Sequence, residues 1–109
     1  MANVPSIFSA PTIVVGFSGP ATVRQADEIA NRLRQSLLAS NRIEVDCSDI
    51  TEVDLSFIQL ILATARSAQN TNKILVLTNP ASGALLEALT FCGVRNGPRK
   101  GFWLEGREA

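Results

Sequence analysis

The chain has no histidine and only two cysteines among its 109 residues. Without an imidazole, a catalytic triad, a histidine general base and a histidine-ligated metal site are all excluded. Cys47 and Cys92 are too few for a structural zinc site and are not paired as CxxC. Both stand in apolar surroundings, so we expect two reduced thiols packed in the core.

Charge is also scarce, because charged residues make up 18% of the chain against roughly 25% in an average soluble domain. Ten basic and ten acidic residues give a net charge of zero. No global field therefore attracts nucleic acid or an anionic membrane. The low charged fraction leaves neutral or apolar surface, which favours a protein that docks onto another protein.

Long apolar stretches are missing as well. The longest runs, residues 60–63 and 74–77, are far shorter than the roughly 20 residues of a membrane span. No Lys or Arg precedes Arg24, as a signal peptide would require. We therefore expect a cytoplasmic protein without direct membrane insertion. The length predicts a single domain over residues 1–109, with a core of about 12–94 and a short tail over 95–109.

Three stretches carry the apolar patterns of β-strands, at residues 12–17, 43–47 and 73–78. The third is apolar almost throughout, as is typical of a strand buried on both faces of a parallel sheet. The sequence Ser18-Gly19-Pro20 is predicted to end the first strand, and residues 48–55 are predicted to form a loop after the second.

Three helical patterns alternate with these strands. The first begins at a capping box of Thr22 and Gln25 and carries an apolar stripe to about residue 39. The second, residues 56–69, is apolar nearly all round and needs cover on more than one side. The third is predicted to be capped by Ser82 and to end at Gly93. Its predicted inward side chains are Leu85, Leu86, Leu89 and Cys92.

The order of elements is β-α-β-α-β-α with short links, which implies parallel neighbours and right-handed crossovers. It predicts an α/β fold, a small layer domain with a mostly parallel central sheet and helices on one or both faces.

Five carboxylates and no basic residue fall within residues 44–54. One interpretation is a magnesium site at the carboxyl ends of the strands. The other is strand alternation, in which Glu44 and Asp46 face away from the core. We favour alternation and expect neither a metal nor another cofactor. An acidic receiver site would also need a lysine after a strand, whereas Lys73 precedes one.

Ser56 and Gln59 have the spacing of a second capping box, so Ser56 is predicted to cap the second helix. A hydroxyl in the first helical turn also lies beside free N–H groups and the positive end of the helix dipole. A phosphate on this hydroxyl would bring about −1.5 to −2 charges. The nearby Asp49, Glu52 and Asp54 would repel it. A protein docked on this apolar helix start would feel the change.

At these residues the chain resembles the STAS domains of bacterial anti-sigma factor antagonists, from about residue 12 to residue 94. The matching segments are Gly19-Pro20-Ala21-Thr22, residues 45–50 and 53–57, and residues 75–80 with Cys92-Gly93-Val94. The resemblance implies a non-enzymatic binding module that a kinase-type anti-sigma factor phosphorylates at Ser56. The unmodified form would bind that kinase and the phosphorylated form would release it. Leu55 and Phe57 replace a serine and a glycine of the family motif.

We therefore predict a partner-binding surface at the start of the second helix. Its candidate residues are Asp49, Asp54, Leu55, Ser56, Phe57 and Leu60. Phe57 has two interpretations. It is either the first inward residue of a buried helix or an exposed aromatic anchor of the interface.

Other functions stay open. The substitutions at Leu55 and Phe57 favour a constitutive STAS subunit of a lipid-transport complex or of a chemotaxis-like signalling assembly, without phosphorylation. A small enzyme or nucleotide binder would need a phosphate loop or a nucleophile–base pair, and no Gly-rich loop follows a strand. We thus expect a protein partner, a second copy of the chain included, and no catalytic residue.

The tail combines basic and aromatic residues, which raises the question of nucleic acid. They are Arg95, Arg99, Lys100, Phe102 and Trp103. We interpret the tail as a solvated loop followed by a short packed strand over residues 102–104 rather than as an RNA-binding patch.

Overall fold

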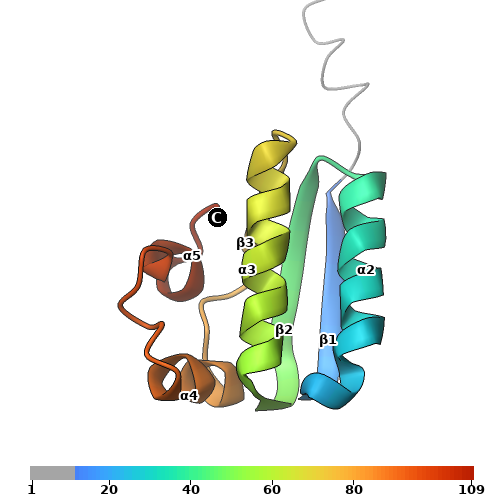
Figure 1. The fold of residues 1–109 in the computed structure, drawn as a ribbon. Helices are drawn as coiled ribbons and strands as arrows, with labels where there is room; N and C mark the ends of the chain where they lie inside the picture. The colour runs from blue at the N-terminus through green and yellow to red at the C-terminus, as the bar shows by residue number, and fades with distance from the viewer. Residues whose placement is uncertain (1–11) are drawn as a thin grey trace, which may run out of the picture.

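Three parallel strands form the sheet of the computed structural model, which describes residues 12–109. The sheet order is β1-β2-β3, so the second strand is central. The strands are β1 (Ile13–Ala21), β2 (Arg42–Val53) and β3 (Ile74–Leu77) (Figure 1). The predicted α/β class and parallel sheet are confirmed.

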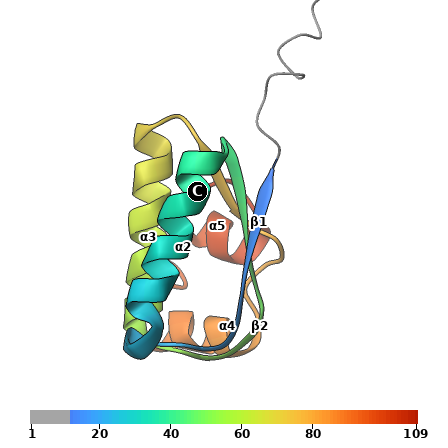
Figure 2. The same cartoon turned by 90° about the vertical axis from the view of Figure 1, so that its right-hand side faces the viewer.

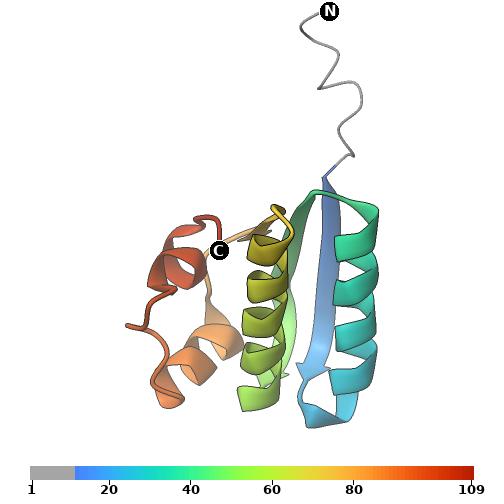
Figure 3. The same cartoon turned by 45° about the horizontal axis from the view of Figure 1, so that its top comes forward.

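Two long helices cover one face of this sheet (Figure 2). They are α2 (Ala26–Ala39), which follows the 3-10 turn η1 (Val23–Gln25), and α3 (Leu55–Asn70). Two shorter helices, α4 (Gly83–Phe91) and α5 (Lys100–Glu105), lie beside α3 beyond the β3 edge (Figures 1 and 3). Among residues 12–109 no helix lies on the opposite face of β1 and β2 (Figure 2).

The core lies between the sheet and the α2–α3 layer. Alternation along β1 and β2 turns one set of side chains toward the helices, while Val14 on the other face is 58% exposed. The β3 strand is buried at Leu75, Val76 and Leu77, as its continuous apolar run predicts. Side chains that fill the centre of the core are Ile29, Leu33, Ile43, Val45, Ile58 and Ile61.

The first two strands are longer than predicted. β1 does not end at Ser18-Gly19-Pro20 but runs on to Ala21, with register shifts on either side of Gly19. Gly19 has a φ of 71°, which glycine adopts without steric cost. Pro20 is tolerated because β1 is an edge strand among the described residues. The predicted loop over residues 48–55 was wrong for the same reason, since the extended β1 gives β2 a pairing partner as far as Val53.

The chain after α4 also differs from its prediction. Residues 102–104 lie in helix α5 rather than in a last strand, and Trp103 is completely buried. The Trp103 carbonyl accepts a hydrogen bond from Ala81 N at 2.7 Å, and Ala109 N donates to Leu75 O at 2.9 Å. The tail therefore packs onto β3, because this burial removes two adjacent aromatic rings, Phe102 and Trp103, from water.

Helix ends follow the sequence signals in part. The capping box of Thr22 and Gln25 is present, although a 3-10 turn precedes the α-helix proper. Gly93 has the predicted left-handed conformation, with a φ of 76°. Ser82 stands at the N-cap of α4, but its side chain makes no capping hydrogen bond there.

Both cysteines are free and half-buried, packed against the core as predicted. Burial raises the pKa of the Cys47 thiol to about 12, and the negative charge of the adjacent Asp46 adds to this effect. Cys47 is therefore a protonated, unreactive thiol at neutral pH.

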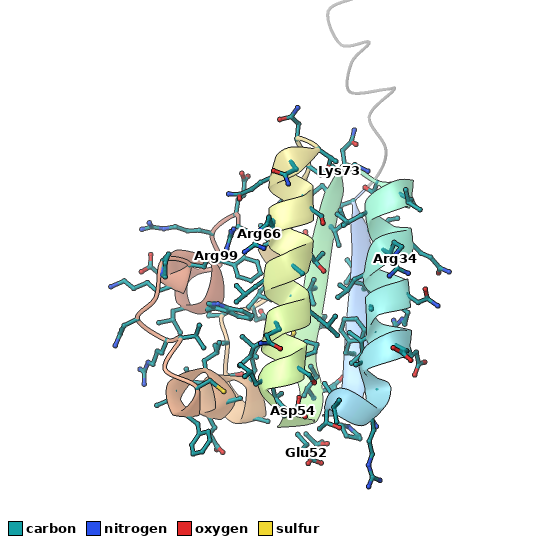
Figure 4. All side chains as sticks on the ribbon, in the orientation of Figure 1. Arg34, Glu52, Asp54, Arg66, Lys73 and Arg99 are labelled. Atoms are coloured by element: carbon teal, nitrogen blue, oxygen red, sulfur yellow. The ribbon has the colours of Figure 1, made fainter. Side chains whose placement is uncertain are left out.

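Lys73 links the end of α2 to the start of β3, because its ammonium group donates to the Leu37 carbonyl near the C-terminal end of the helix (Figure 4). A cation in this position offsets the negative end of the helix dipole. We expect Lys73→Met to lower the free energy of unfolding by about 0.5–1 kcal/mol. Urea denaturation measures the change, with Lys100→Met on the exposed side of α5 as the control. Equal stability of the two variants would contradict a specific role for Lys73.

Candidate functional site

The start of α3 is held by the carboxylate of Asp54, not by the hydroxyl of Ser56. The helix begins at Leu55 with Asp54 as its N-cap, one residue earlier than predicted. Asp54 Oδ1 accepts a hydrogen bond from Ser56 N at 3.0 Å and a second, short one from the Ser56 hydroxyl. The predicted cap was therefore wrong, because Asp54 lies in the extended conformation that an N-cap requires.

The same carboxylate also reaches the turn that precedes α2. Asp54 Oδ2 accepts a hydrogen bond from Val23 N at 3.0 Å, across 31 residues of sequence. Val23 is the first residue of η1, and the N–H group of a first helical residue has no partner within its own turn. One side chain thus joins the starts of both helices that cover the sheet, and we call this arrangement the Asp54 clamp.

The clamp keeps Asp54 ionised. The hydrogen bond from the Ser56 hydroxyl is the largest cause that lowers the pKa of Asp54 below its ordinary value of 3.8. The backbone N–H groups of Val23, Ser56 and Phe57 lower it further, while partial burial opposes them. At neutral pH a full negative charge therefore lies at the N-terminal end of α3, next to the exposed Glu52 (Figure 4). We call this end, residues 54–56, the foot of α3.

Ser56 is half-buried and its hydroxyl proton is directed at Asp54. The tail does not cover it, because the long-range hydrogen bonds and ion pairs between the tail and the rest of residues 12–109 reach β3, the β3–α4 connection, Arg42 and the last turn of α3 at Gln69, and none of them involves Ser56. Because the Ser56 hydroxyl donates its proton to Asp54, the lone pairs of its oxygen stay available to a group that approaches the foot of α3.

A groove of about 700 Å³ opens beside this point, between the end of β2, the start of α3 and helix α4. Two exposed apolar side chains flank it, since Leu55 is 48% exposed and Phe91 is 92% exposed. Its lining carries three carboxylates and no basic residue. The lining residues are Thr51, Glu52, Val53, Asp54, Leu55, Ala84, Glu87, Ala88, Phe91 and Cys92.

The acidic segment 44–54 does not converge on a metal site. Within residues 12–109 no three Cys, Asp or Glu side chains form a group that holds a cation. Asp46 accepts a hydrogen bond from Ser48 N at 2.9 Å, which is the first cause that lowers its pKa. Four of the five carboxylates are spread along the twelve-residue strand β2, and the fifth, Asp54, is the N-cap of α3.

Comparison with known protein families decides the family of the chain. The family described as "Mlab, STAS domain" matches residues 8–100. The chain belongs to the STAS domain family. STAS domains are in general non-enzymatic modules that bind other proteins, so membership of the family supports a regulatory or binding module here.

A solved structure supports the same fold for this STAS domain. It is the crystal structure of a sulfate transporter family protein from Wolinella succinogenes, with a TM-score of 0.64 and 17% sequence identity. The similarity covers 89% of this chain and 80% of that one. A search of the curated proteins gives no match. None of the helices in the part of this STAS domain that the structure describes is both long and apolar enough to span a membrane.

The structure brings three of the six predicted site residues of the STAS domain together, and it corrects the interpretation of one. Asp54, Leu55 and Ser56 lie together at the foot of α3, and Asp49 is exposed on β2. Phe57 is completely buried and packs edge-on against Phe17, with ring centroids 5.9 Å apart. The interpretation of Phe57 as an exposed anchor was therefore wrong, because the first turn of α3 directs this ring into the core.

Leu60 is half-buried against the core of the STAS domain, one turn further along α3. Sequence reasoning missed the contribution of α4, above all Phe91 and Glu87. One signal was available. Leu85, Leu89 and Cys92 define the inward stripe of α4, and an aromatic residue at position 91 falls outside it.

The Asp54 clamp predicts a pH-dependent stability. Because the pKa of Asp54 is lower in the folded state than in the unfolded chain, its contribution is present above pH 3.8 and is lost as the pH falls through the folded value. We expect Asp54→Asn to cost about 1 kcal/mol at neutral pH, since hydrogen bonds to a neutral acceptor are weaker. We also expect the variant to lose less stability than the wild type between about pH 5 and pH 2.

Urea denaturation at a series of pH values tests this, with Asp49→Asn at an exposed position of β2 as the matched control. A wild-type pH dependence retained in full by Asp54→Asn would contradict the clamp.

Proposed function

We propose that this STAS domain binds a protein partner through the foot of α3 and the adjoining groove. We call this the docking surface and define it by Glu52, Leu55, Ser56, Glu87 and Phe91. The observation that supports it best is the pair of exposed apolar side chains, Leu55 and Phe91, on either side of a hollow in a chain of low charge.

The energetics favour this surface as an interface. Full burial of a leucine or phenylalanine side chain is worth about 1.5–3 kcal/mol, and aromatic anchors dominate many protein interfaces. Leu55 and Phe91 leave much of this free energy unused in the isolated chain. The carboxylates of Glu52, Asp54 and Glu87 surround the apolar centre, so a partner with basic side chains at its rim fits best.

We further propose that phosphorylation of Ser56 by a kinase-type anti-sigma factor releases the partner, as the resemblance to anti-sigma factor antagonists implies. A phosphate adds about −1.5 to −2 charges. It would replace the hydrogen bond from Ser56 to Asp54 with repulsion between like charges, and so open the clamp. The bulk of Phe57 does not obstruct a kinase from outside, because its ring is buried in the core.

A second function keeps the docking surface but not the switch. The chain would be a constitutive STAS subunit of a lipid-transport complex or of a chemotaxis-like signalling assembly. Leu55 in place of the first serine of the family motif supports this, because an exposed leucine favours a permanent apolar contact. In either case we propose that residues 1–109 act as one domain, in the cytoplasm and without catalytic activity.

Substitutions on the docking surface test the proposal. We expect Leu55→Asp and Phe91→Asp each to weaken partner binding at least roughly tenfold, because each removes an apolar anchor worth more than about 1.4 kcal/mol. Leu38→Asp is the matched control, since Leu38 is 79% exposed on α2, away from the groove. Crosslinking in the source cells identifies the partner, and calorimetry with the purified partner gives the affinities. Unchanged affinity in both groove variants would refute the docking surface.

The same binding assay distinguishes the phosphorylation switch from the constitutive subunit. We expect Ser56→Asp to lose binding and Ser56→Ala to keep it, because only the former adds a charge beside Asp54. Loss of partner binding by Ser56→Asp, together with phosphoserine at position 56 in protein from the source cells, supports the switch. Full binding by Ser56→Asp would contradict the switch and leave the constitutive subunit.

A further inference from the structure

A second hollow lies between α3 and the tail, and it shares no lining residue with the docking surface. Its volume is about 150 Å³. Two arginines line it, Arg66 from α3 and Arg99 from the turn before α5, and Figure 4 shows both beside α3. Its remaining lining residues are Leu62, Val94, Gly97, Pro98 and Trp103. No carboxylate is among them.

The two guanidinium groups have no carboxylate partner among the described residues. Arg99 donates to Gln69 Oε1 at 3.2 Å, a neutral acceptor, and no hydrogen bond or ion pair within residues 12–109 involves the side chain of Arg66. The acidic residues of the tail are engaged elsewhere. Glu105 pairs with Arg107 at 2.7 Å, and Glu108 lies 3.9 Å from Arg42. Two positive charges therefore share one small hollow without compensation.

The inner wall of the hollow adds an independent observation. Trp103 is completely buried, and its Nε1 is the one buried side-chain N or O atom within residues 12–109 that lacks a hydrogen-bond partner. An indole N–H is a donor only, and buried donors are rarely left without an acceptor. The hollow thus combines three donor-bearing side chains, two arginines and a tryptophan, with apolar walls, and its described lining includes no acidic side chain.

We propose that this hollow binds a phosphate group, and we call it the Arg66–Arg99 site. Guanidinium forks match the oxygens of a phosphate, and two of them balance the two negative charges of a phosphate monoester better than the single charge of a carboxylate. The apolar walls of Leu62, Val94 and Pro98 accommodate the first carbons of the ester. The proposal does not depend on the docking surface, because Arg66 and Arg99 lie away from Glu52 and Asp54 (Figure 4).

Trp103 provides a direct probe of the site, because the chain has one tryptophan and no tyrosine. The experiment titrates the full chain with inorganic phosphate at constant ionic strength and follows Trp103 fluorescence together with the amide NMR signals of Gly97 and Arg99. We expect saturable changes in both. Arg66→Gln and Arg99→Gln should each weaken binding roughly tenfold or more, as expected for the loss of a charge-assisted hydrogen bond.

Matched variants test whether the effect comes from any positive charge or from loss of the fold. Arg34→Gln on α2, where Arg34 donates to Asn31 at 2.8 Å, removes one positive charge on the far side of α3 and should leave binding unchanged (Figure 4). Arg99→Lys keeps the charge without the fork and should bind more weakly than the wild type. Thermal unfolding of each variant shows that the fold is retained.

The source of the phosphate is decided by two further probes, glycerol 3-phosphate and vesicles that contain phosphatidic acid. Binding of glycerol 3-phosphate that the two arginine variants weaken supports a soluble ligand. Binding of vesicles alone, weakened by the same variants, supports a lipid headgroup. No saturable response to any of the three probes would overturn the proposal, as would an equal response to chloride or equal weakening by Arg34→Gln.

Discussion

The two helices that cover the sheet start at the same edge, and the carboxylate of Asp54 bonds to both starts. This is possible because β1 and β2 stay paired as far as Ala21 and Val53, so the chain leaves both strands side by side. Parallel strands bring successive helix starts to one edge of a sheet, where N–H groups without partners gather. The position of Ser56 in the first turn of α3 is fixed by this carboxylate.

The chain has a net charge of zero, but its acidic and basic side chains gather on different parts of the surface. The carboxylates of Glu52, Asp54 and Glu87 lie at the foot of α3 and along the groove, around exposed leucine and phenylalanine side chains. The uncompensated arginines lie against the tail, beside the only tryptophan. Two surfaces of opposite charge on one small STAS domain suit two ligands of opposite charge, because electrostatic complementarity selects partners more than it adds affinity.

Much of the candidate site could be predicted from local sequence signals. Asp54, Leu55 and Ser56 follow from a helix start after an acidic strand, since such signals act over a single turn. Phe57 and Phe91 show the limit of this reasoning. Whether an aromatic side chain points into the core depends on how its helix is rotated about its own axis. For Phe57 this rotation is set by contacts with residues distant in sequence, such as Phe17. The groove itself needs α4 beside α3, which no local pattern encodes.

The sequence by itself determined the order of strands and helices, the parallel sheet and the family, because hydrophobic periodicity and turn residues act locally. Tertiary structure alone decided where β1 and β2 end, that the tail is a helix and which residues meet across 31 positions at the clamp. In each case the physical reason is a contact with residues that are distant in the sequence. A strand continues for as long as a neighbour completes its hydrogen bonds, and an aromatic tail takes the conformation that buries its rings.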